Sequence, residues 1–247
     1  RALISLAQIE MQRNDADAAR AYLRQAPASS QRTVMMGQIA AAEGDFEAAA
    51  AAFADVFDEQ PSFDAARLYF LAANNAGRSD AASRLDTWLQ SNPLDPQANT
   101  LVGGIALGTG DYDEATDRFE VALTSRPDNA AILNNLAWLY DRAGDDRALD
   151  YAERAYAAAP DAPAIADTLG WMLFGRGDNT RALELLEAAG AGDPTNPEIQ
   201  YHLAAALNES GESERASTIL RAVLDSEAPF DARSEAEALM ASIESGN

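Results

Sequence analysis

The chain has 247 residues, of which 40 are acidic and 18 basic, so its formal net charge at pH 7 is −22. A surface this acidic repels nucleic acids and anionic lipid surfaces, which argues against both as partners. Cysteine is absent, which excludes disulfides and thiol chemistry. The sequence contains no apolar run of about 18 residues and therefore predicts no membrane span. Because the chain begins at Arg1 rather than methionine, we expect it to be part of a longer protein.

Two residue types recur along the chain with a period of about 33 residues. Glycine ends a first predicted helix in each period, because it adopts a left-handed backbone without a Cβ clash. Proline follows a second predicted helix, because it cannot continue the hydrogen-bond ladder. The glycines are Gly44, Gly77, Gly110, Gly144, Gly177 and Gly211, and the prolines are Pro61, Pro93, Pro127, Pro160 and Pro194. Each period therefore predicts one helix-turn-helix unit.

The repeat is clearest where one segment occurs twice, as NNLAWLY at 134–140 and as DTLGWML at 167–173. Its period and its alternation of small and large apolar residues resemble the tetratricopeptide repeat (TPR). The resemblance implies an all-α fold, a right-handed α-solenoid that forms a single superhelical domain. The predicted repeats are residues 1–29, 30–61, 62–95, 96–129, 130–162, 163–196 and 197–229, followed by a capping helix at 230–244.

Individual repeats depart from this pattern. In the first, Asn14 and Asp15 stand where later repeats have glycine and aspartate, and the second helix is short. In the third, glycine and proline are out of register, which predicts a local irregularity near Trp88, a residue we assign to the core. Helix pairing is expected to place a small residue such as Gly37 or Gly170 against a large one such as Phe53.

In TPR arrays the first helix of each pair lines the concave surface, so the resemblance implies a groove formed by repeats four to seven. Aromatic rings beside amides and carboxylates would form its wall. The candidate groove-binding residues are Asn134, Asn135, Trp138, Asp141, Arg142, Asp167, Trp171, Phe174, Tyr201, His202 and Asn208. Trp138 and Trp171 occupy equivalent positions, and two interpretations stay open for them: anchors that face the groove, or rings that belong partly to the core.

No motif for catalysis or cofactor binding is evident. The glycine-rich run at 103–110 lies in a predicted helix and lacks the Lys-Ser/Thr of a phosphate-binding loop. His202 is the single histidine and has no cysteine to help it bind a metal. We therefore expect neither an enzyme nor a cofactor.

Four segments resemble the C-terminal part of the TPR-repeat lipoproteins of bacterial exosortase/PEP-CTERM systems: 134–140, 148–155, 167–171 and 197–204. That resemblance implies a lipid anchor upstream, association with exopolysaccharide loci and a periplasmic location at the outer membrane, with the cytoplasm as the alternative. It implies no membrane insertion of this part of the chain.

Two functions follow as hypotheses. The first is a non-catalytic scaffold that binds a protein or peptide, with exopolysaccharide as a second ligand class, in the groove of repeats four to seven. The alternative is a docking or regulatory arm of a larger enzyme, such as a glycosyltransferase.

Overall fold

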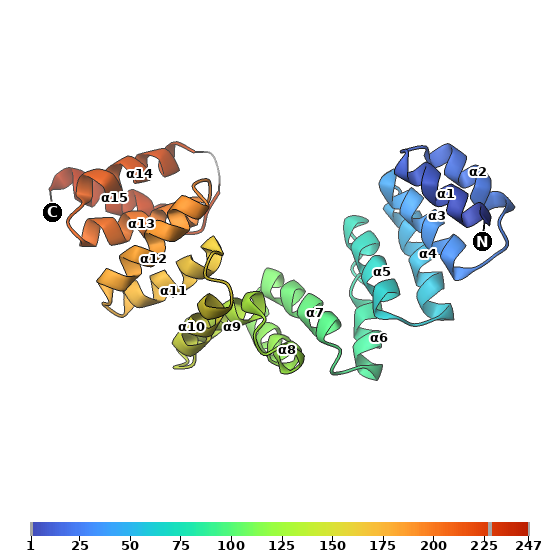
Figure 1. Cartoon of the computed structure of the whole chain (residues 1–247), viewed down its shortest axis with the longest axis horizontal. Coiled ribbons are helices and arrows are strands. Elements are labelled where there is room, and N and C mark those ends of the chain that lie inside the picture. Colours follow the sequence, from blue (N-terminus) through green and yellow to red (C-terminus); the bar gives the residue numbers. More distant parts are fainter. Residues whose placement is uncertain (1, 227–228, 247) are drawn as a thin grey trace. The chain divides into compact units, whose positions relative to one another are not determined.

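The computed structural model describes residues 2–226 and 229–246, and within them it contains fifteen helices and no strand (Figure 1). The helices are α1 (Ala2–Gln12), α2 (Ala16–Gln25), α3 (Ser30–Ala42), α4 (Phe46–Glu59), α5 (Phe63–Asn75), α6 (Ser83–Ser91), α7 (Pro96–Thr109), α8 (Tyr112–Ser125), α9 (Ala130–Ala143), α10 (Ala148–Ala158), α11 (Pro163–Gly175), α12 (Asn179–Gly192), α13 (Pro197–Glu209), α14 (Ser213–Asp225) and α15 (Arg233–Ser245). They form seven consecutive pairs and a final helix. The all-α repeat fold is therefore confirmed. None of the described helices is long and apolar enough to cross a membrane.

The chain divides into two compact units, residues 1–105 and 106–247. The first unit holds the helices from α1 to α6 and most of α7. The second holds those from α8 to α15. The grouping of the whole chain into one superhelical domain stays a prediction.

The turns of the second, fourth and sixth pairs combine a left-handed glycine with an aspartate that caps the next helix. At Gly44 the backbone is left-handed, with φ of 83°, and the N–H of Asp45 donates to Ala40 O at 2.9 Å, which closes the end of α3. The carboxylate of Asp45 then accepts from Ala48 N at 3.1 Å and caps α4. Asn14 takes the place of glycine in the first pair, with φ of 58°. One dipeptide thus ends one helix and begins the next.

In two turns the aspartate binds an arginine and does not cap the next helix. The helix after each of these turns begins further from the glycine than in the other repeats. Asp145 is bound by Arg147, its neighbour two residues on, with an Nη2–Oδ2 distance of 2.9 Å, and α10 begins without a side-chain cap. Asp80 is bound by Arg78 in the same way before α6. The predicted irregularity of the third repeat is this displaced start, and the fifth repeat shares it.

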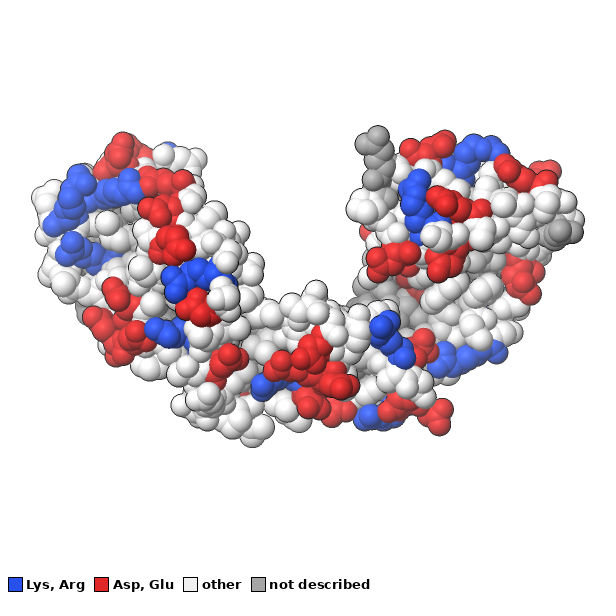
Figure 2. Space-filling view, turned by 180° about the vertical axis from the view of Figure 1, so that it is seen from behind, with Lys and Arg blue, Asp and Glu red and all other residues white. Residues whose placement is uncertain are grey.

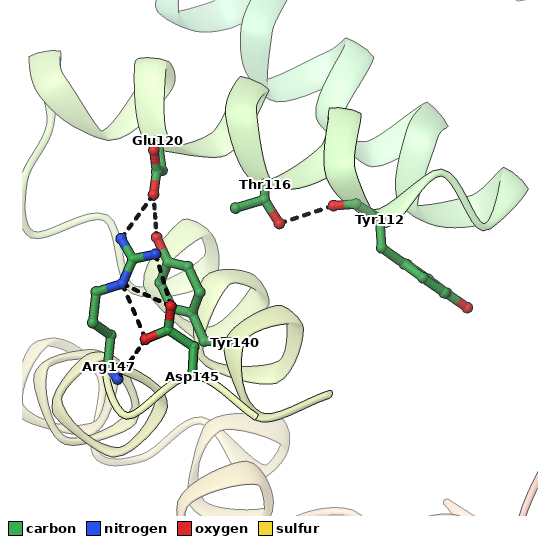
Figure 3. Close-up of polar contacts among 6 residues, drawn as sticks. All are labelled: Tyr112, Thr116, Glu120, Tyr140, Asp145 and Arg147. Carbon is green, nitrogen blue, oxygen red and sulfur yellow. Dashed lines mark hydrogen bonds and ion pairs between the residues drawn. The ribbon is translucent and has the colours of Figure 1, made fainter. Parts of the chain in front are cut away.

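A hydrogen-bonded network around Tyr140 ties α8, α9 and the turn before α10 together (Figure 3). The Tyr140 hydroxyl donates to the carboxylate of Glu120, and Arg147 binds the same carboxylate at 3.0 Å. The guanidinium of Arg147 also lies 4.0 Å from the centroid of the Tyr140 ring. Burial raises the pKa of Tyr140, and the hydrogen bond to Glu120 raises it further.

Because the pKa of Tyr140 is raised in the folded state above its ordinary value near 10, the network stabilises the fold below that pH and loses this contribution as pH rises above it. Tyr140→Phe is expected to cost about 1–2 kcal/mol of unfolding free energy near neutral pH. The difference from the wild type should shrink above about pH 10. Urea unfolding across this pH range measures it, and a difference that grows with pH would contradict the assignment.

Pairs of small and large residues set the distance between paired helices, as predicted. A Cβ added to Gly37 would lie 2.7 Å from the Phe53 ring, and one added to Gly170 would lie 2.9 Å from Leu186. Trp88 is half-buried against the core that α4 to α7 share, and its Nε1 donates to Asp95 at 2.9 Å. Its assignment to the core is confirmed.

Alanine substitutions at two helical glycines should therefore act in opposite directions. Gly37→Ala is expected to lower the unfolding free energy by about 1–3 kcal/mol, because the added methyl would meet the Phe53 ring at 2.7 Å and the Ala52 Cβ, which is fixed to α4, at 3.1 Å. Gly104→Ala is expected to raise it by about 0.5–1 kcal/mol through helix propensity alone, because the added methyl meets nothing within 4 Å. Urea unfolding measures both. Equal effects would show that helix propensity, rather than close approach, governs these positions.

In the second unit, three arginines bind glutamates of the preceding repeat and form what we call the arginine ladder. Its pairs are Arg147 with Glu120, Arg181 with Glu153 and Arg215 with Glu187, at 3.0, 2.7 and 2.8 Å. On the face drawn in Figure 2, arginine atoms lie beside acidic ones over much of the surface. Because such exposed pairs each contribute little free energy, the ladder adds little to the stability of the fold.

Candidate functional site

A cavity of about 590 Å³ lies within the second unit, lined by the first helices of three consecutive repeats, α9, α11 and α13. Its size is that of an ordinary ligand pocket. Its lining is Asn134, Trp138, Asp141, Arg142, Ala164, Asp167, Thr168, Trp171, Met172, Asn196, Glu198, Ile199 and His202. Below we call it the α9–α13 cavity.

Seven of the eleven candidate groove residues line this cavity: Asn134, Trp138, Asp141, Arg142, Asp167, Trp171 and His202. The other four lie outside its lining. Asn135 is half-buried. Phe174 and Tyr201 pack against the Trp171 ring at 5.2 and 5.9 Å between centroids. Asn208 accepts a hydrogen bond from Ser213 Oγ at 2.8 Å.

Several lining residues were missed because the candidate positions lay in the middle and the last turns of each helix and not in its first turn. Ala164 and Glu198 lie one helical turn before Thr168 and His202, on the same helix face. The signal was present: extending each predicted face by four residues toward the helix start would have found both.

The most buried polar contact of the cavity joins α11 to α13. Nδ1 of His202 lies 2.9 Å from Oδ1 and 3.1 Å from Oδ2 of Asp167, and both residues are only 8% exposed. Because an ionised carboxylate only accepts, Nδ1 carries the proton that it donates. The other ring nitrogen, Nε2, faces Glu198 at 3.8 Å. The histidine is thus held in one orientation between two carboxylates.

The two tryptophans have different surroundings although their positions in the repeat are equivalent. Trp171 is half-buried and stacks on the His202 ring at 4.0 Å with an interplanar angle of 14°. Trp138 is 42% exposed and contacts Tyr112 edge-on at 5.5 Å. The residue types in the following repeat explain this, because Trp171 meets His202 and Tyr201, whereas the equivalent positions after Trp138 carry the smaller Asp167 and Thr168. Trp171 therefore supports the cavity wall, and Trp138 offers an open ring surface.

Some polar and charged groups of the cavity have ion-pair or hydrogen-bond partners among the described residues, and others do not. Asp141 is paired with Arg176 at 3.2 Å. Arg142 lies over the rings of Tyr112 and Trp138, at 4.3 and 5.7 Å from their centroids, and within the described part of the chain it forms no ion pair. Oδ1 of Asn134 is buried and has no hydrogen-bond partner among the described residues. The cavity lining therefore includes three carboxylates and one arginine.

A smaller, apolar hollow of about 210 Å³ lies in the first unit. Phe46, Phe53, Leu68 and Leu71 contribute most of its surface, with Gln38 and Asn75 also in its lining. None of the candidate groove residues lines it.

Paired helices in series, with a cavity lined by successive first helices, define a helical-repeat protein. Sequence profiles described as tetratricopeptide repeat match residues 70–117, 103–163 and 173–243. The chain is a tetratricopeptide-repeat protein. No curated protein sequence matches it.

Solved structures show the same fold at low sequence identity. The Pseudomonas aeruginosa protein pilF is 15% identical with a TM-score of 0.69, over 88% of this chain and 97% of that one. A TPR protein from Parabacteroides merdae is 16% identical with a TM-score of 0.64, over 98% and 97%. YrrB, described as a TPR protein with an unusual peptide-binding site, is 22% identical with a TM-score of 0.56, over 71% and 92%. At these identities the likeness concerns the fold alone.

Proposed function

We propose that this protein is a non-catalytic scaffold that binds an extended peptide segment of a partner protein in the α9–α13 cavity. TPR proteins bind protein or peptide partners and are typically scaffolds rather than enzymes. The observation that carries the proposal is the cavity itself, with the ring of Trp138 exposed at its wall. Exposed tryptophan beside polar groups is the usual composition of an interface anchor.

A random-peptide phage library selected on the intact protein tests this proposal. The wild type should enrich a defined set of peptides, and Trp138→Ala should bind them about 30-fold more weakly, as expected for loss of an aromatic anchor. Leu94→Ala is a matched control, because Leu94 is an exposed apolar residue of the first unit, outside the cavity. If the wild type enriches no peptides, or if both variants bind equally well, the proposal fails.

The setting of this scaffold is a further part of the proposal. We place it at the outer membrane, on the periplasmic side, within a bacterial exopolysaccharide-secretion or protein-sorting system. The support is the resemblance of the segments at 134–140, 148–155, 167–171 and 197–204 to exosortase/PEP-CTERM TPR lipoproteins. A lipid-attachment cysteine upstream in the full-length sequence would support this location, whereas a catalytic domain there would favour the docking-arm alternative.

A further inference from the structure

We propose that the α9–α13 cavity selects a cationic side chain, lysine or arginine, of the bound peptide. This inference rests on the proposed function and specifies the chemistry of the partner. It follows from two features of the cavity lining: a carboxylate that accepts no hydrogen bond from the described residues, and an exposed tryptophan ring.

The carboxylate is that of Glu198, in the first turn of α13. The other two carboxylates of the cavity already have cationic or N–H partners, since Asp141 binds Arg176 and Asp167 binds His202. The nearest nitrogen to Glu198 is Nε2 of His202 at 3.8 Å, which exceeds hydrogen-bond distance. The Glu198 side chain is 36% exposed, so a ligand can reach it. The strongest unused hydrogen-bond acceptor of the cavity is thus an anion.

Ammonium and guanidinium groups carry three and five N–H donors and no acceptor. A basic side chain can therefore donate to Glu198, which lines the cavity and is partly exposed.

The aromatic ring is that of Trp138, and tryptophan is the best of the aromatic side chains for contact with a cation. Arg142 already contacts part of this ring, since its guanidinium lies 5.7 Å from the ring centroid. The methylene groups of a lysine or arginine would pack on the part of the ring that remains exposed.

An anionic ligand is the competing possibility, because Arg142 lines the cavity without an ion pair. That anion would lie beside three carboxylates in a chain of net charge −22. The surrounding field therefore opposes an anion and favours a cation, and the same field would accelerate the approach of a basic segment at low salt.

The peptides selected from the random library test this inference separately from the proposed function. We expect lysine or arginine at one fixed position in the enriched set. A synthetic copy of one enriched peptide with norleucine at that position should bind at least about tenfold more weakly, because it loses a hydrogen bond between charged groups. Isothermal titration of the intact protein gives both affinities.

Glu198→Gln should weaken the basic peptide about tenfold and leave the norleucine peptide unchanged. Glu209→Gln is the matched control, because it removes the same charge from α13 but lies outside the cavity lining. An enriched set without a basic residue, or one rich in acidic residues or free C-terminal carboxylates, would overturn the inference and leave the proposed function standing. Equal effects of Glu198→Gln and Glu209→Gln would overturn it as well. A library without any enrichment would instead defeat the proposed function.

Discussion

His202→Ala is expected to lower the free energy of unfolding by about 3–5 kcal/mol, the largest effect of any change considered. The substitution leaves the carboxylate of Asp167, which is 8% exposed, without the imidazole that binds it at 2.9 Å. It also removes the ring on which Trp171 stacks. Thermal or urea unfolding of the variant measures the loss.

The double variant Asp167→Ala/His202→Ala measures the free energy of the contact between the two side chains, separately from their contacts with other residues. Because both members of the contact are removed, no unpaired buried charge remains, and the double variant should be more stable than the sum of the two single losses predicts. Additive losses would show that Asp167 and His202 contribute independently and that their contact is not the cause.

Trp171→Ala is expected to cost about 3 kcal/mol of unfolding free energy, whereas Trp138→Ala should cost less than about 1 kcal/mol. The Trp171 ring packs against three other rings, those of Phe174, Tyr201 and His202, so its removal leaves a cavity. The Trp138 ring is 42% exposed, and little space is left behind when it is truncated.

Thermal melts of the two variants decide between the roles of the two rings. A Trp138 variant that unfolds as early as the Trp171 variant would assign both rings to the core and remove the support for the proposed binding site. Two variants with melts like the wild type would show that the stacked rings around Trp171 contribute little.

The helical pairs could be predicted from the sequence because their signals are local. A glycine such as Gly44 needs only its own backbone conformation to end a helix, and Asp45 needs only the next turn to begin one. Small residues opposite large ones, such as Gly37 opposite Phe53, follow from the same period. Repetition supplied the remaining evidence, since each position was observed several times.

The polar contacts of the site could not be predicted in the same way, because they depend on side chains from different repeats. Asp167 and His202 are 35 positions apart and do not occupy equivalent places in their repeats. Asp167 is the first residue of the repeated segment at 167–173, whereas His202 is the second residue of the matching segment that begins at Tyr201. The unequal exposure of Trp138 and Trp171 has the same origin, since the neighbouring repeat determines it. The repeat period alone predicts the same surroundings for side chains at equivalent positions. The candidate site arises because adjacent repeats carry different residues at those positions.

The spacing of the arginine ladder determines which changes in chain length it can accommodate. Each repeat from the fifth to the seventh offers an arginine to the glutamate 27 or 28 positions earlier, in the repeat before it. Gain or loss of one whole repeat leaves every arginine opposite a glutamate. An insertion or deletion of another length within a repeat shifts these partners out of register. Changes in length by whole repeats are therefore compatible with the ladder, whereas other changes break its pairs.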